Sequence, residues 1–172
     1  MKVVEYQRLL FGLGSSRFII DGCLLPIKYD SREYWCWYYN QQLYVAESMP
    51  SQRVWNRRDT VAYRLHGDFS NCYPKFPSMD FLDLLKTEKI LIASSKAEIS
   101  QQEWILPDGK TVCHSDSGEW YVDGFLVMKM TRPKPFLKEL LAFTKITRIE
   151  LFTEKEMIPT FLAIYILTGQ NE

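Results

Sequence analysis

The pattern of apolar and polar positions predicts short β-strands through the first fifty residues. RFIIDGCLLPI (17–27) is apolar and β-branched on both sides of Asp21-Gly22, a dipeptide typical of a tight hairpin turn. A second hairpin follows in EYWCWYYNQQLYVAES (33–48), where Asn40-Gln41-Gln42 separates two runs of large side chains. The sequence therefore predicts antiparallel pairing between neighbouring segments.

Both faces of this second hairpin carry aromatic rings. Side chains alternate between the two faces of a strand, so Trp35, Trp37 and Tyr39 share one face, and Tyr34 and Tyr38 share the other. In a strand with one solvent-exposed face, apolar residues would alternate with polar ones. We therefore expect both faces of this hairpin to be covered by protein, or one face to bind a partner. Tryptophans are costly to leave in water, and we assign the first face to the core. The face of Tyr34 and Tyr38 is the better candidate for contact with a partner.

Further hairpins and two or three helices are predicted in the rest of the chain. Turn dipeptides occur at Asp108-Gly109, Ser117-Gly118 and Asp123-Gly124. Helical spacing occurs in MDFLDLLK (79–86) and RPKPFLKELLAFTK (132–145). A last helix is predicted after the capping box of Thr153 and Glu156 and ends near Gly169. Pro159 is expected to kink or delay this helix. We expect one α+β domain over residues 1–172, with an antiparallel β-rich body of hairpins and two of the helices near the C-terminus.

Composition fits such a domain, and charge narrows its partners. The chain has 172 residues, of which 47% are hydrophobic and 15% aromatic, and a formal net charge of zero. This balance argues against a protein held on duplex DNA by charge alone. The charge is segregated along the chain, with five bases against two acids in 51–78, nine acids against four bases in 79–126, and six bases against two acids in 127–152. The sequence leaves open whether the two basic segments share a surface.

No feature of the sequence indicates a membrane, export or a metal. The longest apolar run, FLAIYIL (161–167), is far shorter than the ~20 residues of a membrane-spanning helix. The first residues lack the apolar region of a signal peptide. The four cysteines form no CxxC pair, and we expect them to be reduced and the protein to be cytoplasmic. We expect no metal or other cofactor, and one cooperative domain that is stable without either.

The only two histidines, His66 and His114, are the candidates for acid–base catalysis. Two histidines beside a phosphodiester can cleave RNA without a metal, with nearby arginines holding the phosphate. No G-x-S-x-G elbow, P-loop or dinucleotide fingerprint accompanies them. Both lie beside turn residues, where exposed polar side chains are common, and we do not expect them to form a catalytic pair.

The segment SQRVWNRRDTVAYRLHG (51–67) is the strongest candidate for a partner-binding surface. It interleaves arginines with aromatic rings: Arg53, Trp55, Arg57, Arg58, Tyr63 and Arg64. Such residues stack on bases and hold phosphates in single-stranded nucleic acids, and they also dominate protein–protein interfaces. The alternative is a strand with its rings turned inward and its arginines in water.

Two functions remain as hypotheses. The first is a non-enzymatic binding or accessory protein in a larger cytoplasmic assembly, with a protein as the favoured partner and a single-stranded nucleic acid as the second candidate. The second is a small metal-independent ribonuclease-like enzyme that uses His66 and His114. The sequence names neither the partner, the pathway nor the oligomeric state.

Overall fold

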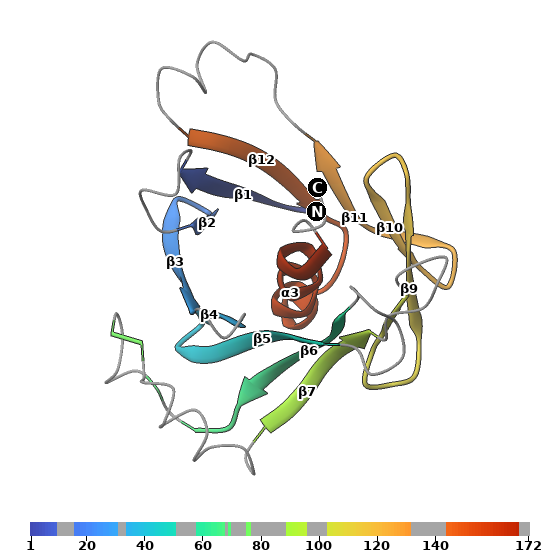
Figure 1. Cartoon of the computed structure of the whole chain (residues 1–172). Helices are drawn as coiled ribbons and strands as arrows, with labels where there is room; N and C mark the ends of the chain where they lie inside the picture. The colour runs from blue at the N-terminus through green and yellow to red at the C-terminus, as the bar shows by residue number, and fades with distance from the viewer. Residues whose placement is uncertain are drawn as a thin grey trace.

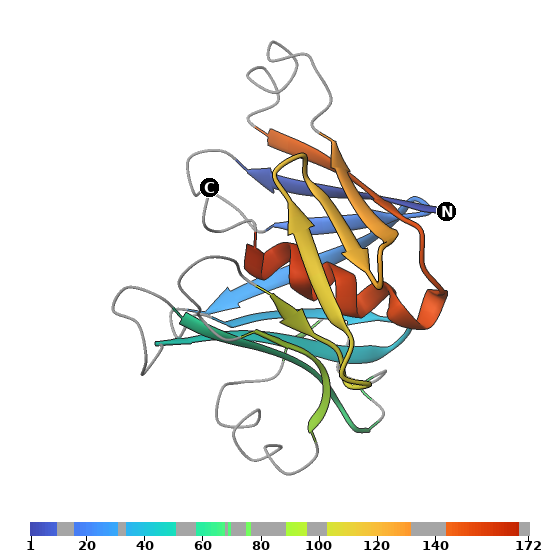
Figure 2. The same cartoon turned by 90° about the vertical axis from the view of Figure 1, so that its right-hand side faces the viewer.

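Twelve antiparallel strands of the described chain close into a barrel in the computed structural model (Figures 1 and 2). The structure describes residues 1–9, 16–30, 34–50, 58–67, 69, 75–76, 89–95, 103–131 and 144–168. The strands are β1 (Lys2–Leu9), β2 (Arg17–Ile20), β3 (Cys23–Asp30), β4 (Tyr34–Tyr39), β5 (Gln42–Pro50), β6 (Arg58–Leu65), β7 (Lys89–Ser95), β8 (Trp104–Ile105), β9 (Thr111–Ser115), β10 (Glu119–Val122), β11 (Phe125–Thr131) and β12 (Thr144–Leu151).

Each strand pairs with its neighbours in the sequence, and the first and last strands complete the ring. β1 and β12 pair over their whole lengths, from Lys2 opposite Leu151 to Leu9 opposite Thr144. Closure joins the two terminal strands, which would otherwise be sheet edges. The pairing is shortest at β8, which contacts only two residues of β7 and two of β9. The barrel is therefore an up-and-down meander joined end to end.

Glycine-containing turns set several of the hairpins, as the sequence predicts. Asp21 and Gly22 have φ of 51° and 78°, and Asp123 and Gly124 have φ of 51° and 79°. Positive φ at both central positions identifies a turn whose twist matches that of the flanking strands. Asn40 and Gln41 adopt the same conformation without a glycine, at φ of 49° and 62°, so all three of these predicted turns are confirmed.

The two ends of the barrel differ in how the strands are joined. One end, here the hairpin end, contains the turns at 21–22, 40–41, 106–110 and 123–124, and also the connection from β6 to β7 (66–88), most of which lies outside the described part. The opposite end, here the loop end, contains the turn at 115–118, and there the other connections run through residues outside the described part. The chain leaves β12 at the hairpin end and enters the barrel from that side (Figure 2).

A single α-helix of the described residues, α3 (Ile158–Thr168), lies inside the barrel (Figure 1). Every residue from Ile158 to Leu167 is buried, as expected for a helix that is apolar on all sides. A 3-10 turn, η3 (Lys155–Met157), precedes it, and Glu154 precedes η3 without a side-chain capping bond. The predicted capping box is therefore wrong. Of the two predicted effects of Pro159, the delay is confirmed and the kink is not: the α-helix begins only at Ile158, and Pro159 lies in its first turn, where its missing N–H costs no helical hydrogen bond.

Small side chains bring α3 close to one wall. Ala46, Ala62 and Ala93 are directly opposite one another on β5, β6 and β7, and each is 0% exposed. We call these three residues the alanine row. α3 packs against the same three strands. Larger core side chains occupy the opposite wall, among them Val4, Phe18, Met128, Ile149 and Leu151.

A second apolar cluster covers the outside of β4, β5 and β6. We call it the outer cluster. It contains Tyr34, Cys36 and Tyr38 of β4 together with Leu43, Val45, Tyr63, Leu65 and Phe69, and Val61 and Phe76 pack against it. The Tyr38 ring stacks on Phe76 at 5.4 Å between centroids. Trp35 and Trp37 belong instead to the core inside the barrel. Both faces of the aromatic hairpin are thus covered, which confirms the first of the two predicted alternatives for it.

The predicted fold class is wrong. The molecule is a closed antiparallel barrel around one helix, not an α+β body with helices beside a set of hairpins. The predicted helices at 79–86 and 132–143 lie outside the described residues, while Thr144 and Lys145, predicted to be helical, begin β12. Residues 58–65 form β6 within the wall, between β5 and β7. The error arises because barrel closure depends on pairing between β1 and β12, which local patterns do not report.

Candidate functional site

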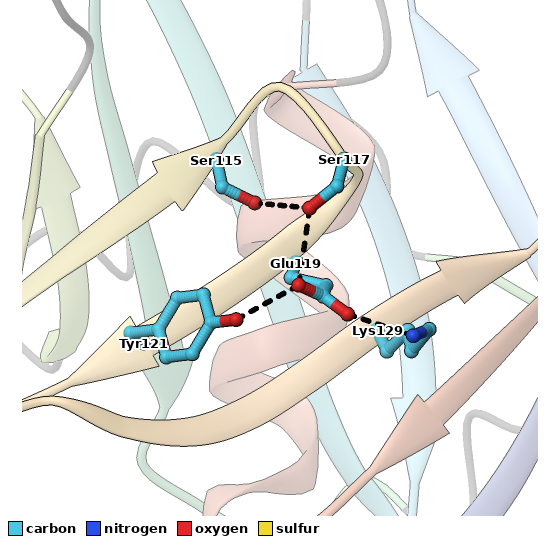
Figure 3. A network of polar contacts seen from close by, with 5 residues as sticks. All are labelled: Ser115, Ser117, Glu119, Tyr121 and Lys129. Atoms are coloured by element: carbon cyan, nitrogen blue, oxygen red, sulfur yellow. Dashed lines mark hydrogen bonds and ion pairs between the residues drawn. The ribbon is translucent and has the colours of Figure 1, made fainter.

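Glu119 is the centre of a polar network on the outer wall of β9, β10 and β11 (Figure 3). Lys129 Nζ donates to Glu119 Oε1 at 2.7 Å, and the Tyr121 hydroxyl donates to Oε2 at 2.8 Å. Ser117 Oγ donates to the same Oε2 at 3.0 Å and lies 2.7 Å from Ser115 Oγ. The carboxylate thus accepts three hydrogen bonds from side chains on two strands and a turn.

Strand register places the charges of this network in a line across the wall. Glu119 is directly opposite Lys129 on β11, and Lys129 is opposite Glu150 on β12. Arg148 forms an ion pair with Glu150 at 3.1 Å. Opposite charges in neighbouring cross-strand positions attract one another, so the row stabilises the pairing of β10, β11 and β12.

The network holds Glu119 in its ionised form. The hydrogen bond from Lys129, followed by those from Tyr121 and Ser117, lowers the pKa of Glu119 to about 2. The same carboxylate raises the pKa of Lys129 and the pKa of Tyr121 through the hydrogen bonds that it accepts. All three groups therefore keep their ordinary charge states at neutral pH.

This arrangement suits structural support better than acid–base catalysis. A general base works best when its pKa lies near the operating pH, and a carboxylate with a pKa of about 2 is a weak base. The Ser115 and Ser117 hydroxyls approach this carboxylate, but it provides little driving force for removing a proton from either. We therefore interpret the network as a clamp between strands.

The clamp predicts a specific acid sensitivity. Because folding lowers the pKa of Glu119, its stabilising contribution is complete above the ordinary glutamate value of 4.5 and is lost as the pH falls towards about 2. The stability advantage of wild type over Glu119→Gln should be largest near pH 7 and should shrink over that acid range. Urea unfolding at several pH values measures it, with Glu103→Gln, a change at an exposed glutamate before β8, as the matched control. A Glu119→Gln difference that is constant with pH would contradict the assignment.

Tyr63 takes part in a smaller polar cluster on the outer wall of β5, β6 and β7. Its hydroxyl donates to Glu47 Oε1 at 2.6 Å. Lys89 Nζ lies 3.5 Å from the same oxygen and 3.9 Å from the centroid of the Tyr63 ring. Tyr63 is 2% exposed, so both the ring and the hydroxyl are occupied within the chain.

Arg64 points to the other side of β6 from Tyr63. It is directly opposite Tyr44, whose side chain belongs to the barrel core. Burial raises the pKa of Tyr44, and the charge and hydrogen bond of Arg64 act against this rise. Arg64 is half-buried near the hairpin end, and Trp37 stacks on the Tyr44 ring at 5.9 Å. Tyr63 and Arg64 therefore do not present one continuous surface.

The other predicted partner-binding residues divide into two groups. Arg53, Trp55 and Arg57 lie outside the described residues, and Arg58 is described only as the first residue of β6. Tyr34 and Tyr38 are each 2% exposed beneath the outer cluster, and the Tyr38 hydroxyl donates to the carbonyl of Lys75 at 3.2 Å. A partner would reach the Tyr38 ring only if Phe76, which stacks on it, moved. Their role in binding stays a prediction.

The two histidines lie at opposite ends of the barrel. His66 directly follows β6 at the hairpin end, whereas His114 lies near the loop end of β9. Strands β7 and β8 separate β6 from β9 around the ring. His114 stacks on Trp120 at 4.4 Å between ring centroids. This placement does not bring the two imidazoles to one substrate.

The carboxylates near the turns also lie apart. Asp108 and Asp123 belong to hairpin-end turns, whereas Asp116 and Glu119 lie at the loop end. No group of three or more His, Cys, Asp or Glu side chains in the described residues could hold a metal ion. Within the same residues, no helix has the length and apolarity needed to cross a bilayer.

Exposed apolar side chains gather at the hairpin end, a feature that the sequence analysis missed. Eight large hydrophobic side chains of the described residues are exposed. Six lie next to or within the first or last three residues of their strands at the hairpin end: Met1, Leu24, Ile90, Leu91, Phe125 and Phe152. Of the other two, Tyr29 lies near the loop end of β3, and Ile105 lies on the two-residue strand β8, opposite Ser94 near the loop end of β7. Alternation within single strands could not reveal this, because the six residues come from five separate places around the ring.

Two of these residues, Phe125 and Phe152, are aromatic. Phe125 directly follows the Asp123-Gly124 turn and is 76% exposed, and Phe152 is 40% exposed. The Phe152 N–H donates to the Val127 carbonyl at 2.9 Å, so the two phenylalanines belong to adjacent strand ends. Large apolar side chains that are exposed to solvent in the unbound protein are typical of surfaces that bind other molecules.

Comparison with known proteins finds no family model, curated protein or solved structure that matches this chain.

Proposed function

We propose that this chain is a non-enzymatic binding protein that docks a protein partner on the hairpin end of its barrel. The observation that carries the proposal is the concentration of exposed apolar side chains at that end, with Phe125 and Phe152 the largest. Aromatic side chains at the centre of an interface supply much of its binding energy.

The filled interior supports surface binding over carriage of a large ligand within the barrel. Barrels of this size can enclose ligands, but here α3 and the core aromatic residues occupy the interior. Nothing in the described residues assembles a catalytic acid, base and nucleophile, and the most ordered polar network is built around a weakly basic carboxylate. A scaffold that presents one end to a partner is consistent with both observations.

A protein partner is favoured over a single-stranded nucleic acid by the charges near this end. Basic and acidic groups pair within the chain there, as in Lys2 with Asp21 and Lys110 with Asp108. Nucleic-acid binding needs basic groups free to neutralise phosphates. Of the segment 51–67, predicted to bind a partner, residues 51–57 lie outside the described part, between β5 and β6.

Site-specific photo-crosslinking in cells tests the proposal. A benzophenone amino acid placed at Phe125 should form adducts with one discrete protein, because this side chain would lie within the interface. The same amino acid at Tyr29, which is 57% exposed at the loop end, is the matched control and should not form that adduct. Serine at Phe152 should reduce the Phe125 adduct about tenfold or more, the loss expected when a central aromatic contact is removed.

The outcomes separate the hypotheses. Equal adducts from positions 125 and 29, or no discrete adduct from 125, would overturn the hairpin end as the docking surface. An adduct removed by nuclease, with binding that weakens steeply as salt rises, would identify a nucleic acid instead. Circular dichroism of the Phe152→Ser variant must show an intact barrel for the comparison to hold.

We also propose a reducing compartment such as the cytoplasm. Cys23 and Cys113 are exposed free thiols. Exposed unpaired thiols are typical of compartments that keep cysteine reduced.

A further inference from the structure

A row of uncharged polar side chains crosses the inside of the barrel near the loop end. Ser48, Thr60, Ser95 and Trp104 are directly opposite one another on β5, β6, β7 and β8. They lie two residues beyond the alanine row, on the wall against which α3 packs. Because residues opposite one another in antiparallel strands share a face, we call these four the polar row.

Three members of the polar row are buried without hydrogen bonds. Thr60 and Ser95 are each 3% exposed and Trp104 is 1% exposed. Thr60 Oγ1, Ser95 Oγ and Trp104 Nε1 have no hydrogen-bond partner within the described parts of the chain. The hydroxyl of Thr168, at the end of α3, is also buried and unpartnered within these parts. Four such atoms therefore lie at one end of a largely apolar interior.

Proteins rarely leave neighbouring buried polar atoms unsatisfied, because each has lost its hydrogen bonds to water. Where protein groups do not provide the partner, a bound molecule does so. The last carbonyls of a helix also lack intrahelical donors, and α3 ends at this side of the barrel. Donors and acceptors are thus both present around the polar row.

We propose that the polar row binds a neutral hydrogen-bonding group inside the barrel. The indole N–H of Trp104 can only donate, so the bound group must carry an acceptor. The hydroxyls of Thr60 and Ser95 can donate and accept. No charged side chain belongs to the row, so an ion would be buried without an opposite charge. Water, or the hydroxyl or amide of a small uncharged ligand, has the required chemistry.

Removing the hydroxyls provides the first test. Thr60→Val and Ser95→Ala keep most of the shape but remove the contacts to the bound group. Each should lower the midpoint of thermal unfolding by about 2–4 °C or more. Ser94→Ala, which removes a hydroxyl from the adjacent, half-buried position of β7, is the matched control and should change it less. Variants that are as stable as wild type, or more stable, would overturn the proposal, since removing truly unsatisfied polar atoms relieves their cost.

A second measurement on the unmodified protein identifies the source of the bound group. Native mass spectrometry followed by denaturation should release a small neutral molecule if the group belongs to a ligand. If it is water, nuclear magnetic resonance should show a cross-peak between the Trp104 indole proton and long-lived water. Detection of either supports the polar row as a binding site. If neither is detected, the row is unoccupied and the proposal is wrong.

Discussion

Replacing Leu162 with aspartate is expected to prevent the barrel from folding. Leu162 lies on α3 and is 0% exposed, inside a ring of strands on all sides. The change removes a buried apolar side chain, which alone costs about 2–5 kcal/mol for truncation to alanine. It also adds a carboxylate that must stay charged without a partner or take up a proton, at a cost of roughly several kcal/mol. A domain is stable by about 5–15 kcal/mol in total, so the folded state should not persist.

Leu162→Met is the matched control, because it keeps an apolar side chain of similar volume and should cost less than about 1.5 kcal/mol. Circular dichroism and soluble yield compare the two variants. A folded Leu162→Asp protein with a wild-type melting temperature would mean that α3 does not fill the barrel.

Trp37→Ala should cost about 3–5 kcal/mol, the range for removal of a buried tryptophan. Trp37 is 0% exposed and links two parts of the aromatic core. Its ring stacks on Tyr44 at 5.9 Å and meets Phe18 edge-on at 6.4 Å. Truncation would leave a cavity beside both rings. Urea unfolding should show the loss as a lower transition midpoint with an unchanged slope.

Trp37→Phe retains an aromatic ring and should lose clearly less stability than the alanine variant. The indole N–H has no hydrogen-bond partner in the described chain, so its removal should add little to the cost. Equal losses from the two substitutions would show that the indole N–H, and not the volume of the ring, makes the contribution of Trp37.

Local sequence signals predicted the local parts of the fold. Asp-Gly at 21–22 and 123–124 favours positive φ at two successive residues, and the structure has that conformation at both. The face of Trp35 and Trp37 was predicted to lie in the core, because exposing two indole rings to water is unfavourable. Both residues are part of the interior. These inferences succeeded because the cause and the consequence lie within a few residues.

Closure and the position of the last helix required information that no short segment contains. The run from Ile158 to Leu167 is apolar on all sides, which indicates a helix surrounded by protein. The sequence alone gave no reason to surround it with strands from the whole chain. Read without that ring, the same run indicated an ordinary helix near the C-terminus of an α+β domain.

The candidate sites were less predictable than the turns. In the sequence, Glu119 directly follows Gly118 and resembles any other carboxylate beside a glycine turn. Its partners Lys129 and Tyr121 become neighbours only through the register of β10 with β11 and through alternation along β10. The apolar hairpin end is similarly assembled from strand termini far apart in the sequence. Of the segment predicted to bind a partner, residues 51–57 lie outside the described residues.

The pairing of β1 with β12 also determines when the chain can fold. Residues 2–9 can pair with β12 only after residues 144–151 have been synthesised, and α3 follows still later. Contacts between distant parts of a chain slow folding, because the long loop between them must close first. Until then, β1 exposes an unpaired edge and the alanine row has no helix beside it. A nascent chain would therefore pass through a state with open edges and an exposed interior, the kind of state that chaperones protect from aggregation.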